Sequence, residues 1–326
     1  MKTLLLTAAA VALLAMAGCD RKPAPATRAA DGKVHILCTT FPMYLFTRNV
    51  TAGSKTISVE MMAAASAGCP HDYVLTPQDM QAITGADALI INGLGMEEFL
   101  SGMLAKAGPK VRIIDTSRGI DGVIEMAHEE AGHDDHHHEH CQFNPHLFAS
   151  PKMAAKVVAN IAAALGELAP GEASLFAANA AAYQQRLAAL GEEFAKAAQA
   201  LPNKKIVTQH AVFDYLARDC GLEIVAVIEA APGQEPSAAD MLKIIRTVRD
   251  SGAAAVFTEP QYSPKAAQAI ARETNVRVAE LDPVASGPAD APLDYYQAVM
   301  RANLATLQNA LGRGDMKPEA ADAAID

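Results

Sequence analysis

The strongest constraint on the fold is a regular alternation of short apolar runs with stretches of helical periodicity. The runs fall in two sets of four: VHILCTT, TISVEMM, DALIING and VRIID, and later KKIVTQ, EIVAVI, AAAVFTE and VRVAEL. Strands that alternate with helices form βα units, and their sheets are mainly parallel. The pattern therefore predicts an α/β fold with two similar lobes, each a mainly parallel four-stranded sheet flanked by helices.

An Ala-rich stretch from Pro151 to Leu201 separates the two sets and is interrupted at the letters LAPGEAS. From Glu172 to Ala200 it is nearly free of Gly and Pro and keeps apolar residues at helical spacing, which predicts one long helix. Such a helix reaches roughly 40 Å, enough to join two lobes rigidly. Two shorter helices in a bundle are the alternative.

The first residues have the pattern of an export signal. Lys2 precedes an apolar run from Leu4 to Ala17, which is too short to span a bilayer as a mature helix. The letters LLAMAGC resemble a bacterial lipoprotein signal, in which residues 1–18 are removed and Cys19 is lipidated. Asp20 favours retention at the inner membrane in some Gram-negative envelopes. The alternative is an ordinary secreted protein in which Cys19 is incidental.

Composition suggests where the folded part begins. Residues 19–33 carry Pro, Ala and charge without an apolar period, as a flexible tether does. We expect an N-terminal lobe at 34–170, a linking helix at 171–201 and a C-terminal lobe at 202–326. No later run reaches the ~18 apolar residues of a spanning helix, so lipid would provide the only membrane attachment.

Charge and cysteine content limit the partners and the covalent links. The net charge of −10, with acids and bases interspersed, leaves no basic face for nucleic acid. An exported chain can form disulfides, and four cysteines allow three complete pairings that the sequence does not distinguish. Those cysteines are Cys38, Cys69, Cys141 and Cys220.

Helix starts are marked by capping residues, which also locate the loops. They are Thr76-Pro77 with Asp79, Ser150-Pro151, Ser263-Pro264, and Ser237 with Asp240.

Three histidines and one aspartate lie beside these loops. His71 lies between the second run and the next helix, and His146 lies just before the Ala-rich stretch. His210 directly follows KKIVTQ, and Asp282 directly follows VRVAEL. Ligands of open α/β sheets bind in loops at the carboxyl ends of strands. Three neutral imidazoles and a carboxylate form a four-coordinate shell that suits Zn²⁺, although other divalent ions accept it and a lone loop histidine is commonly a surface residue.

Five ordered motifs extend this interpretation: PHDYVLTPQD, NPHLFASP, QHAVFDYLA, FTEPQYSPKAA and LDPV. Together they resemble the metal-binding solute-binding proteins of ABC transporters, most of all the zinc-binding, ZnuA-like group of the cluster A-I type. The resemblance implies two lobes joined by a rigid helix and a metal between them. It gives the ligand roles to His71, His146, His210 and Asp282. Manganese-binding relatives place Glu where this chain has His210, so the third imidazole favours zinc over manganese.

The chain departs from that family pattern near the expected ligands. Asn144 replaces the Asp that is common before Pro-His, which alters the hydrogen bonding of the ligand. Cys69, two residues before His71, could pair with Cys38, act as a thiolate ligand or be an inert thiol. We expect Glu259, which follows a strand in FTEPQ, to support a ligand residue or to have a structural role, and direct ligation of the metal is the alternative.

A histidine-rich segment at 128–141 has a different character, because its histidines alternate with acids on a polar stretch. Such a segment has nothing to bury and is typical of a loop. It is either a solvated acidic loop or an auxiliary, low-affinity collector of zinc, and similar loops occur in zinc-binding relatives of the family. The residues are His128, His133, His136, His137, His138 and His140.

The sequence therefore predicts a receptor and not an enzyme. We expect a monomer in the periplasm or on the cell surface, anchored through Cys19, that captures Zn²⁺ and delivers it to an ABC permease and its ATPase. A manganese or iron receptor of the same fold is one alternative. A zinc-dependent hydrolase is another, although no HExxH pattern is present. An adhesin function would leave no trace in the sequence.

Overall fold

The computed structural model describes residues 32–62, 73, 75–100, 102, 111–126, 142–229 and 233–312. Several expected features lie outside these ranges. They are the signal at 1–18 with Cys19, most of the tether at 19–33, His71, Cys69, Cys141 and the six histidines His128, His133, His136, His137, His138 and His140.

Two four-stranded sheets are present in the described part of the chain, and the strand pairs in both are parallel. The first contains β1 (Val34–Cys38), β2 (Ile57–Met61), β3 (Ala88–Ile91) and β4 (Arg112–Asp115). The second contains β5 (Lys205–Thr208), β6 (Glu223–Val227), β7 (Ala255–Thr258) and β8 (Arg277–Glu280). Their orders, β2-β1-β3-β4 and β6-β5-β7-β8, are equivalent, which confirms the prediction of two similar α/β lobes.

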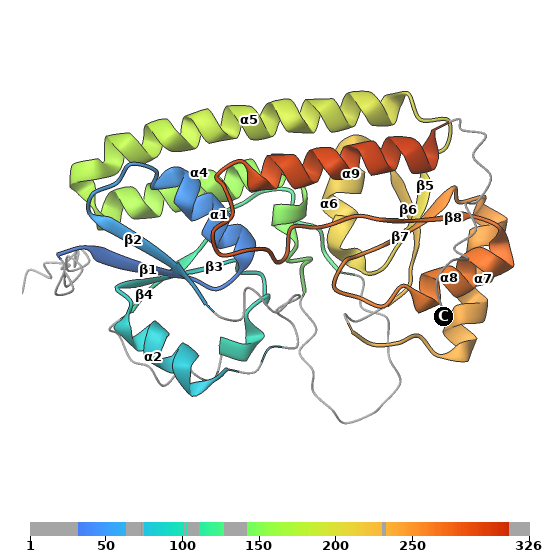
Figure 1. Cartoon of the computed structure of the whole chain (residues 1–326), viewed down its shortest axis with the longest axis horizontal. Coiled ribbons are helices and arrows are strands. Elements are labelled where there is room, and N and C mark those ends of the chain that lie inside the picture. Colours follow the sequence, from blue (N-terminus) through green and yellow to red (C-terminus); the bar gives the residue numbers. More distant parts are fainter. Residues whose placement is uncertain are drawn as a thin grey trace, which may run out of the picture.

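Helices flank both sheets (Figure 1). The α-helices are α1 (Phe41–Val50), α2 (Pro77–Gly85), α4 (Pro151–Leu168), α5 (Ala173–Gln199), α6 (Asp214–Cys220), α7 (Ala238–Ser251), α8 (Lys265–Thr274) and α9 (Tyr295–Leu311). Short 3₁₀ turns are η3 (Glu98–Leu100), η4 (Leu147–Ala149), η5 (Pro170–Glu172) and η6 (Ala211–Phe213).

Three of the four predicted caps are confirmed. The Thr76, Ser150 and Ser237 side chains each accept a hydrogen bond from the first turn of their helix. The fourth prediction was wrong by one residue, because α8 begins at Lys265 and Pro264 is its cap. There the Ser263 hydroxyl only accepts a long bond, 3.5 Å, from the Lys265 N–H.

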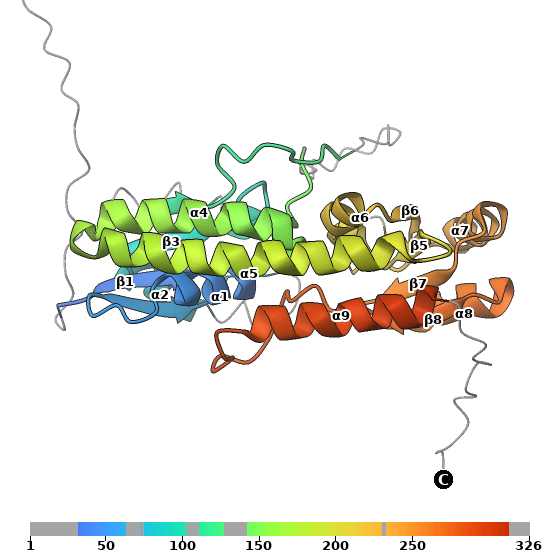
Figure 2. The ribbon, with the colours of Figure 1, turned by 90° about the horizontal axis from the view of Figure 1, so that it is seen from above.

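Helix α5 is continuous from Ala173 to Gln199, so the alternative of two shorter helices is excluded. It runs along both lobes (Figure 1), and seen from above α4 lies beside it over the first lobe (Figure 2). Its buried side chains recur on one stripe, including Phe176, Tyr183, Leu187 and Phe194. An apolar stripe of this kind fixes a helix to the core beneath it.

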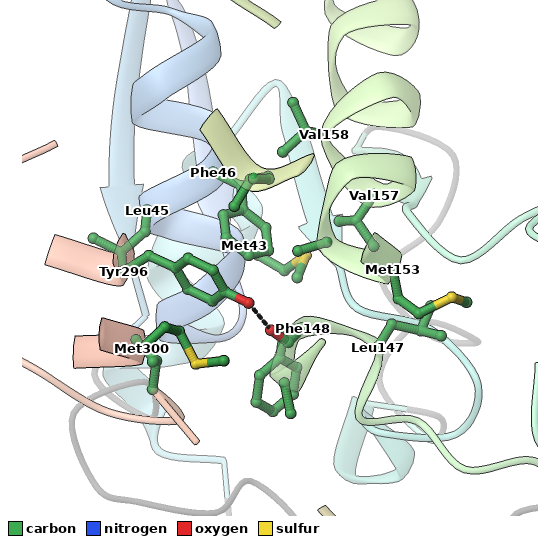
Figure 3. Close-up of a cluster of buried hydrophobic side chains, with 14 of the residues drawn as sticks. Met43, Leu45, Phe46, Leu147, Phe148, Met153, Val157, Val158, Tyr296 and Met300 are labelled. Atoms are coloured by element: carbon green, nitrogen blue, oxygen red, sulfur yellow. Dashed lines mark hydrogen bonds between the residues drawn. The ribbon is translucent and has the colours of Figure 1, made fainter. Parts of the chain in front are cut away.

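Helix α9 forms a second connection between the lobes that the sequence did not indicate. Its Tyr296 and Met300 enter the apolar cluster of the first lobe, beside Phe46 of α1 (Figure 3). The Tyr296 hydroxyl donates to the Phe148 carbonyl at 2.7 Å, and the side chain is fully buried. The lobes therefore share a continuous core in addition to the long helix.

The segment before α9 is also attached to the first lobe. Gly287 passes so close to Phe41 that a Cβ on it would lie 2.3 Å from the ring Cζ. Three side chains of α1 then donate to the carbonyls of alternate residues: Tyr44 to Ala289 at 2.9 Å, Arg48 to Ala291 at 2.6 Å and Asn49 to Leu293 at 2.8 Å. The chain that leaves the second sheet is thus held on α1.

Glu172, at the turn before α5, ties that helix to the loop between α1 and β2. Its carboxylate accepts hydrogen bonds from the Ser54 hydroxyl, from the Lys55 N–H at 3.0 Å and from the Thr56 hydroxyl at 2.8 Å. These bonds, that of Ser54 first, hold the pKa of Glu172 below its ordinary value. The carboxylate therefore contributes stability that is complete above the ordinary Glu range and is lost as pH falls through its lowered pKa.

Replacing Glu172 with Gln should lower the free energy of unfolding at pH 7, because a neutral amide accepts these bonds more weakly. At pH 3 the difference between variant and parent should shrink, since this pH lies below the ordinary Glu range, where the stability that comes from the lowered pKa is being lost. Urea denaturation of both proteins at the two pH values measures this. An equal difference at both values would show that the charge of Glu172 contributes nothing.

Cys38 and Cys220 are free, buried thiols. Cys69, the partner that the sequence allowed for Cys38, lies outside the described residues, so the role of Cys69 stays a prediction. Burial raises the pKa of both thiols to about 12, so both are protonated and unreactive at neutral pH. Within the described ranges, no helix combines the length and apolarity needed to cross a membrane.

Candidate metal centre

The order of the second sheet brings His210 and Glu259 together. His210 comes two residues after β5 and Glu259 directly after β7, and these parallel strands are neighbours. The chain turns to opposite sides after β5 and β7, so the carboxyl ends of these strands form a topological switch point, where open α/β sheets bind ligands. The His210 Nδ1 lies 2.6 Å from the Glu259 Oε1, and neither side chain is more than 3% exposed.

The contact with Glu259 determines which His210 nitrogen can bind a metal. A carboxylate oxygen accepts, so Nδ1 carries the proton and Nε2 keeps its lone pair. The other Glu259 oxygen accepts from Gln261 Nε2 at 3.0 Å, and the Tyr262 ring lies 5.5 Å from the imidazole. A hydrogen-bonded carboxylate of this kind orients a ligand histidine and increases its basicity. Glu259 thus contacts His210 as expected, and its part in metal binding remains a prediction.

His146 belongs to the first lobe and lies at the start of η4. The preceding residues are held by a bridge between Glu125 and Phe143, and Ser150 caps the following helix. The ring is 5% exposed and lies edge-on to Phe148 at 5.9 Å. Fixed structure on both sides therefore gives the side chain of His146 a defined direction.

Asn144 sets the tautomer of His146. Its Oδ1 accepts from the backbone N–H of His146 at 3.0 Å and lies 2.9 Å from the ring Nδ1. Because the backbone N–H can only donate, this amide atom is the oxygen, and the imidazole must donate to it through Nδ1. Nε2 of His146 is again the nitrogen with a lone pair. The amide therefore fixes the orientation of the His146 ring.

His146 and His210, from different lobes, are neighbours in the structure. Their ring centroids lie 5.0 Å apart, with an angle of 72° between the planes. Two imidazoles from separate lobes, each with Nδ1 held by an acceptor, would supply half of the predicted four-ligand shell.

Asp282 is not part of this pair. It follows β8, which lies two strands from β5, a separation of roughly 10 Å at strand spacing. Its Oδ1 accepts from the Val284 N–H at 2.7 Å, and burial raises the pKa of its carboxyl. Among the residues that the structure describes, no three His, Cys, Asp or Glu side chains form a metal-binding group. With His71 outside those ranges, the four-ligand set stays a prediction.

The loop after β3 holds the segment that carries His146. The sequence analysis did not predict this contact. The Asn92 side chain donates to the Pro145 carbonyl at 2.9 Å. The buried Glu97 carboxylate in turn accepts from the Asn92 N–H at 2.7 Å and from the Gly93 N–H at 3.0 Å. Burial raises the pKa of Glu97 despite these bonds. The letters NGLG directly after a strand could have indicated a tight turn here, and both glycines do have positive φ.

Comparison with known proteins identifies the family of the chain. The model of the family described as "Zinc-uptake complex component A periplasmic" matches residues 36–310. The chain belongs to the ZnuA family. The family is described as a component of zinc uptake, which is a transport role, and this favours the receptor over the hydrolase alternative.

Individual ZnuA-family proteins are similar along most of the chain. The zinc-binding lipoprotein AdcA of Streptococcus pneumoniae serotype 4 is 31% identical over 312 residues, which is 94% of this chain and 61% of AdcA. The high-affinity zinc uptake system protein ZnuA of Bacillus subtilis (strain 168) is 29% identical, over 93% of this chain and 95% of that protein. A crystal structure of ZnuA has a TM-score of 0.71, 29% identity, and coverage of 86% and 99%. The chain spans 56% to 61% of the length of the AdcA proteins that it matches.

Proposed function

We propose that this chain is an extracytoplasmic receptor that captures Zn²⁺ between its two lobes and delivers it to an ABC permease and its ATPase. The observation that carries the proposal is the pair His146 and His210. These imidazoles come from different lobes, are buried, and lie with centroids 5.0 Å apart. Each has Nδ1 held by an acceptor, which leaves Nε2 for the metal.

The proposed ligands are His71, His146, His210 and Asp282. His146 and His210 would bind first, and Asp282 would complete the shell after its side chain turns from the Val284 N–H. A shell rich in imidazole suits zinc better than the oxygen-rich shells of manganese sites. The names of the relatives, which refer to zinc binding and zinc uptake, support zinc as the cargo.

The same proposal covers location and organisation. A periplasmic family and a relative named as a lipoprotein support export and anchoring through Cys19. Residues 1–18 would then be the signal, 19–33 the tether, 34–170 and 202–326 the lobes, and 171–201 the linking helix. The histidine-rich segment at 128–141 would be an auxiliary collector of zinc.

Zinc binding should weaken as pH falls, because ligand imidazoles must be deprotonated. A free imidazole titrates near pH 6.5, so we expect much lower affinity at about pH 5 than at pH 7.5. Competition with a zinc chelator of known pH dependence measures this, with residues 128–141 deleted so that only the interlobe site is counted. Equal affinity at both pH values would exclude imidazole ligation.

Metal choice is tested in the same experiment. At pH 7.5 a tenfold excess of Mn²⁺ should not displace bound Zn²⁺, because zinc lies above manganese in the general affinity series and imidazole strengthens that order. Displacement would support the manganese or iron receptor instead.

A further inference from the structure

Asn144 connects the surroundings of the two histidines across the lobes. On one side its Oδ1 accepts from the backbone and ring of His146. On the other side its Nδ2 donates to the Ala211 carbonyl at 2.7 Å and to the Asp214 Oδ2 at 3.0 Å. Ala211 directly follows His210. One fully buried carboxamide therefore lies between the segments that carry both imidazoles.

The orientation of this carboxamide is fixed by its backbone partners. The His146 N–H requires an acceptor, and the Ala211 carbonyl requires a donor. An amide meets both demands at once, with its two N–H groups used by Ala211 and Asp214. A carboxylate at position 144 would still accept from His146, but its second oxygen would face a carbonyl and the Asp214 carboxylate.

Helix α6 strengthens this connection from the second lobe. The Tyr215 hydroxyl donates to the Asn144 carbonyl at 2.6 Å and accepts from the Ile124 N–H at 3.1 Å. About one turn further along, Asp219 accepts from the Ser150 hydroxyl at 2.7 Å. The start of α6 is thus held against the first lobe, directly beside Asn144.

We propose that Asn144 is a positioning residue that sets the spacing of His146 and His210 across the lobes, and that an amide is required because Asp214 faces it. The inference rests on the proposed zinc site for its effect on binding. Its structural part, the coupling of Asn144 to the His146 ring and to Asp214, can be measured without metal.

The decisive variants exchange amide and carboxylate between the two positions. Asn144→Asp places two carboxylates within hydrogen-bonding distance and should lower zinc affinity about 10–100-fold, as loss of a ligand's supporting partner does. Asp214→Asn alone should leave affinity nearly unchanged, since the new amide can present its oxygen to Asn144. The double variant Asn144→Asp/Asp214→Asn restores a donor opposite the carboxylate but leaves the Ala211 carbonyl facing it, so it should recover part of the loss, which a double-mutant cycle quantifies.

Asn160→Asp is the matched control. Asn160 likewise donates through Nδ2 to two acceptors, here the carbonyls of Thr116 at 2.9 Å and Arg118 at 3.0 Å, and neither is next to a predicted ligand. Zinc affinity, measured by chelator competition at pH 7.5 with residues 128–141 deleted, should be unchanged in this variant. Equal affinities of Asn144→Asp and Asn160→Asp, or no recovery in the double variant, would overturn the proposal.

A second measurement separates this proposal from zinc binding itself. In the metal-free parent, NMR of ¹⁵N-labelled imidazole should show His146 with its proton on Nδ1. Asn144→Ala should move that ring towards the Nε2–H tautomer while Asn160→Ala leaves it unchanged. An unaltered tautomer in Asn144→Ala would refute the positioning role even if zinc binds. A parent that binds no zinc but shows the tautomer change would refute only the proposed function.

Discussion

Replacing His210 with Ala is expected to abolish tight one-to-one zinc binding in a protein that lacks residues 128–141. The variant removes one of the two imidazoles that the structure brings together from different lobes. Loss of an outer partner of a ligand costs about 10–100-fold in metal affinity, so loss of the ligand itself should cost more than about 100-fold. Isothermal titration or chelator competition at pH 7.5 measures the change.

The same change leaves the buried Glu259 without the imidazole that donates to it. We therefore expect lower stability as well, by about 1–3 kcal/mol, because a buried acceptor loses its donor. Unfolding experiments without metal measure this separately from binding. His210→Gln, which keeps a donor near Glu259 but is a poor zinc ligand, should recover part of the stability without recovering zinc affinity.

His35→Ala is the matched control, because it removes a histidine from β1, outside the candidate centre. Its zinc affinity should equal that of the parent. If His210→Ala also kept the affinity and stoichiometry of the parent, the interlobe site would be disproved, because that site cannot keep its full affinity after losing one of its ligands.

The fold could be predicted from sequence because its signals are local and repeated. Each Val- and Ile-rich run contains one strand, and the cap residues Thr76, Ser150 and Ser237 stand where helices start. The path of α9 had no such signal. Tyr296 and Met300 pack into the first lobe although they belong to the last helix, and an apolar stripe does not specify which core it joins.

The candidate centre was predictable to the extent that sheet order determines it. His210 and Glu259 follow neighbouring strands of the second sheet, so a parallel β5-β7 pair brings them together. Asn144 was noticed because it stands where the family commonly has Asp before Pro-His, and its position two residues before His146 lets its side chain reach the ring. The partnership of Asn144 with Asp214 spans 70 residues between lobes, and nothing local in the sequence indicates it.

Replacing Tyr296 with Ala is expected to lower the free energy of unfolding by about 3–5 kcal/mol, the range for removing a buried aromatic side chain. Tyr296 is fully buried, packs against Phe46 with ring centroids 5.3 Å apart and donates to the Phe148 carbonyl. Burial raises its pKa well above the ordinary value, so the hydroxyl stays protonated as a donor. Guanidinium denaturation of the metal-free protein measures the loss.

Two further variants divide this effect between packing and hydrogen bonding. Tyr296→Phe keeps the ring and leaves the Phe148 carbonyl without its donor, so the loss should be only about 1 kcal/mol. Tyr44→Phe removes an exposed hydroxyl that donates to Ala289 and should cost less still. If Tyr296→Ala were no more destabilising than Tyr44→Phe, α9 would not support the first lobe, and α5 would be the principal connection between the lobes. A loss of about 3–5 kcal/mol would mean that packing, as well as Asn144, holds the lobe with His210 to the lobe with His146. The two imidazoles would then keep their spacing before metal binds.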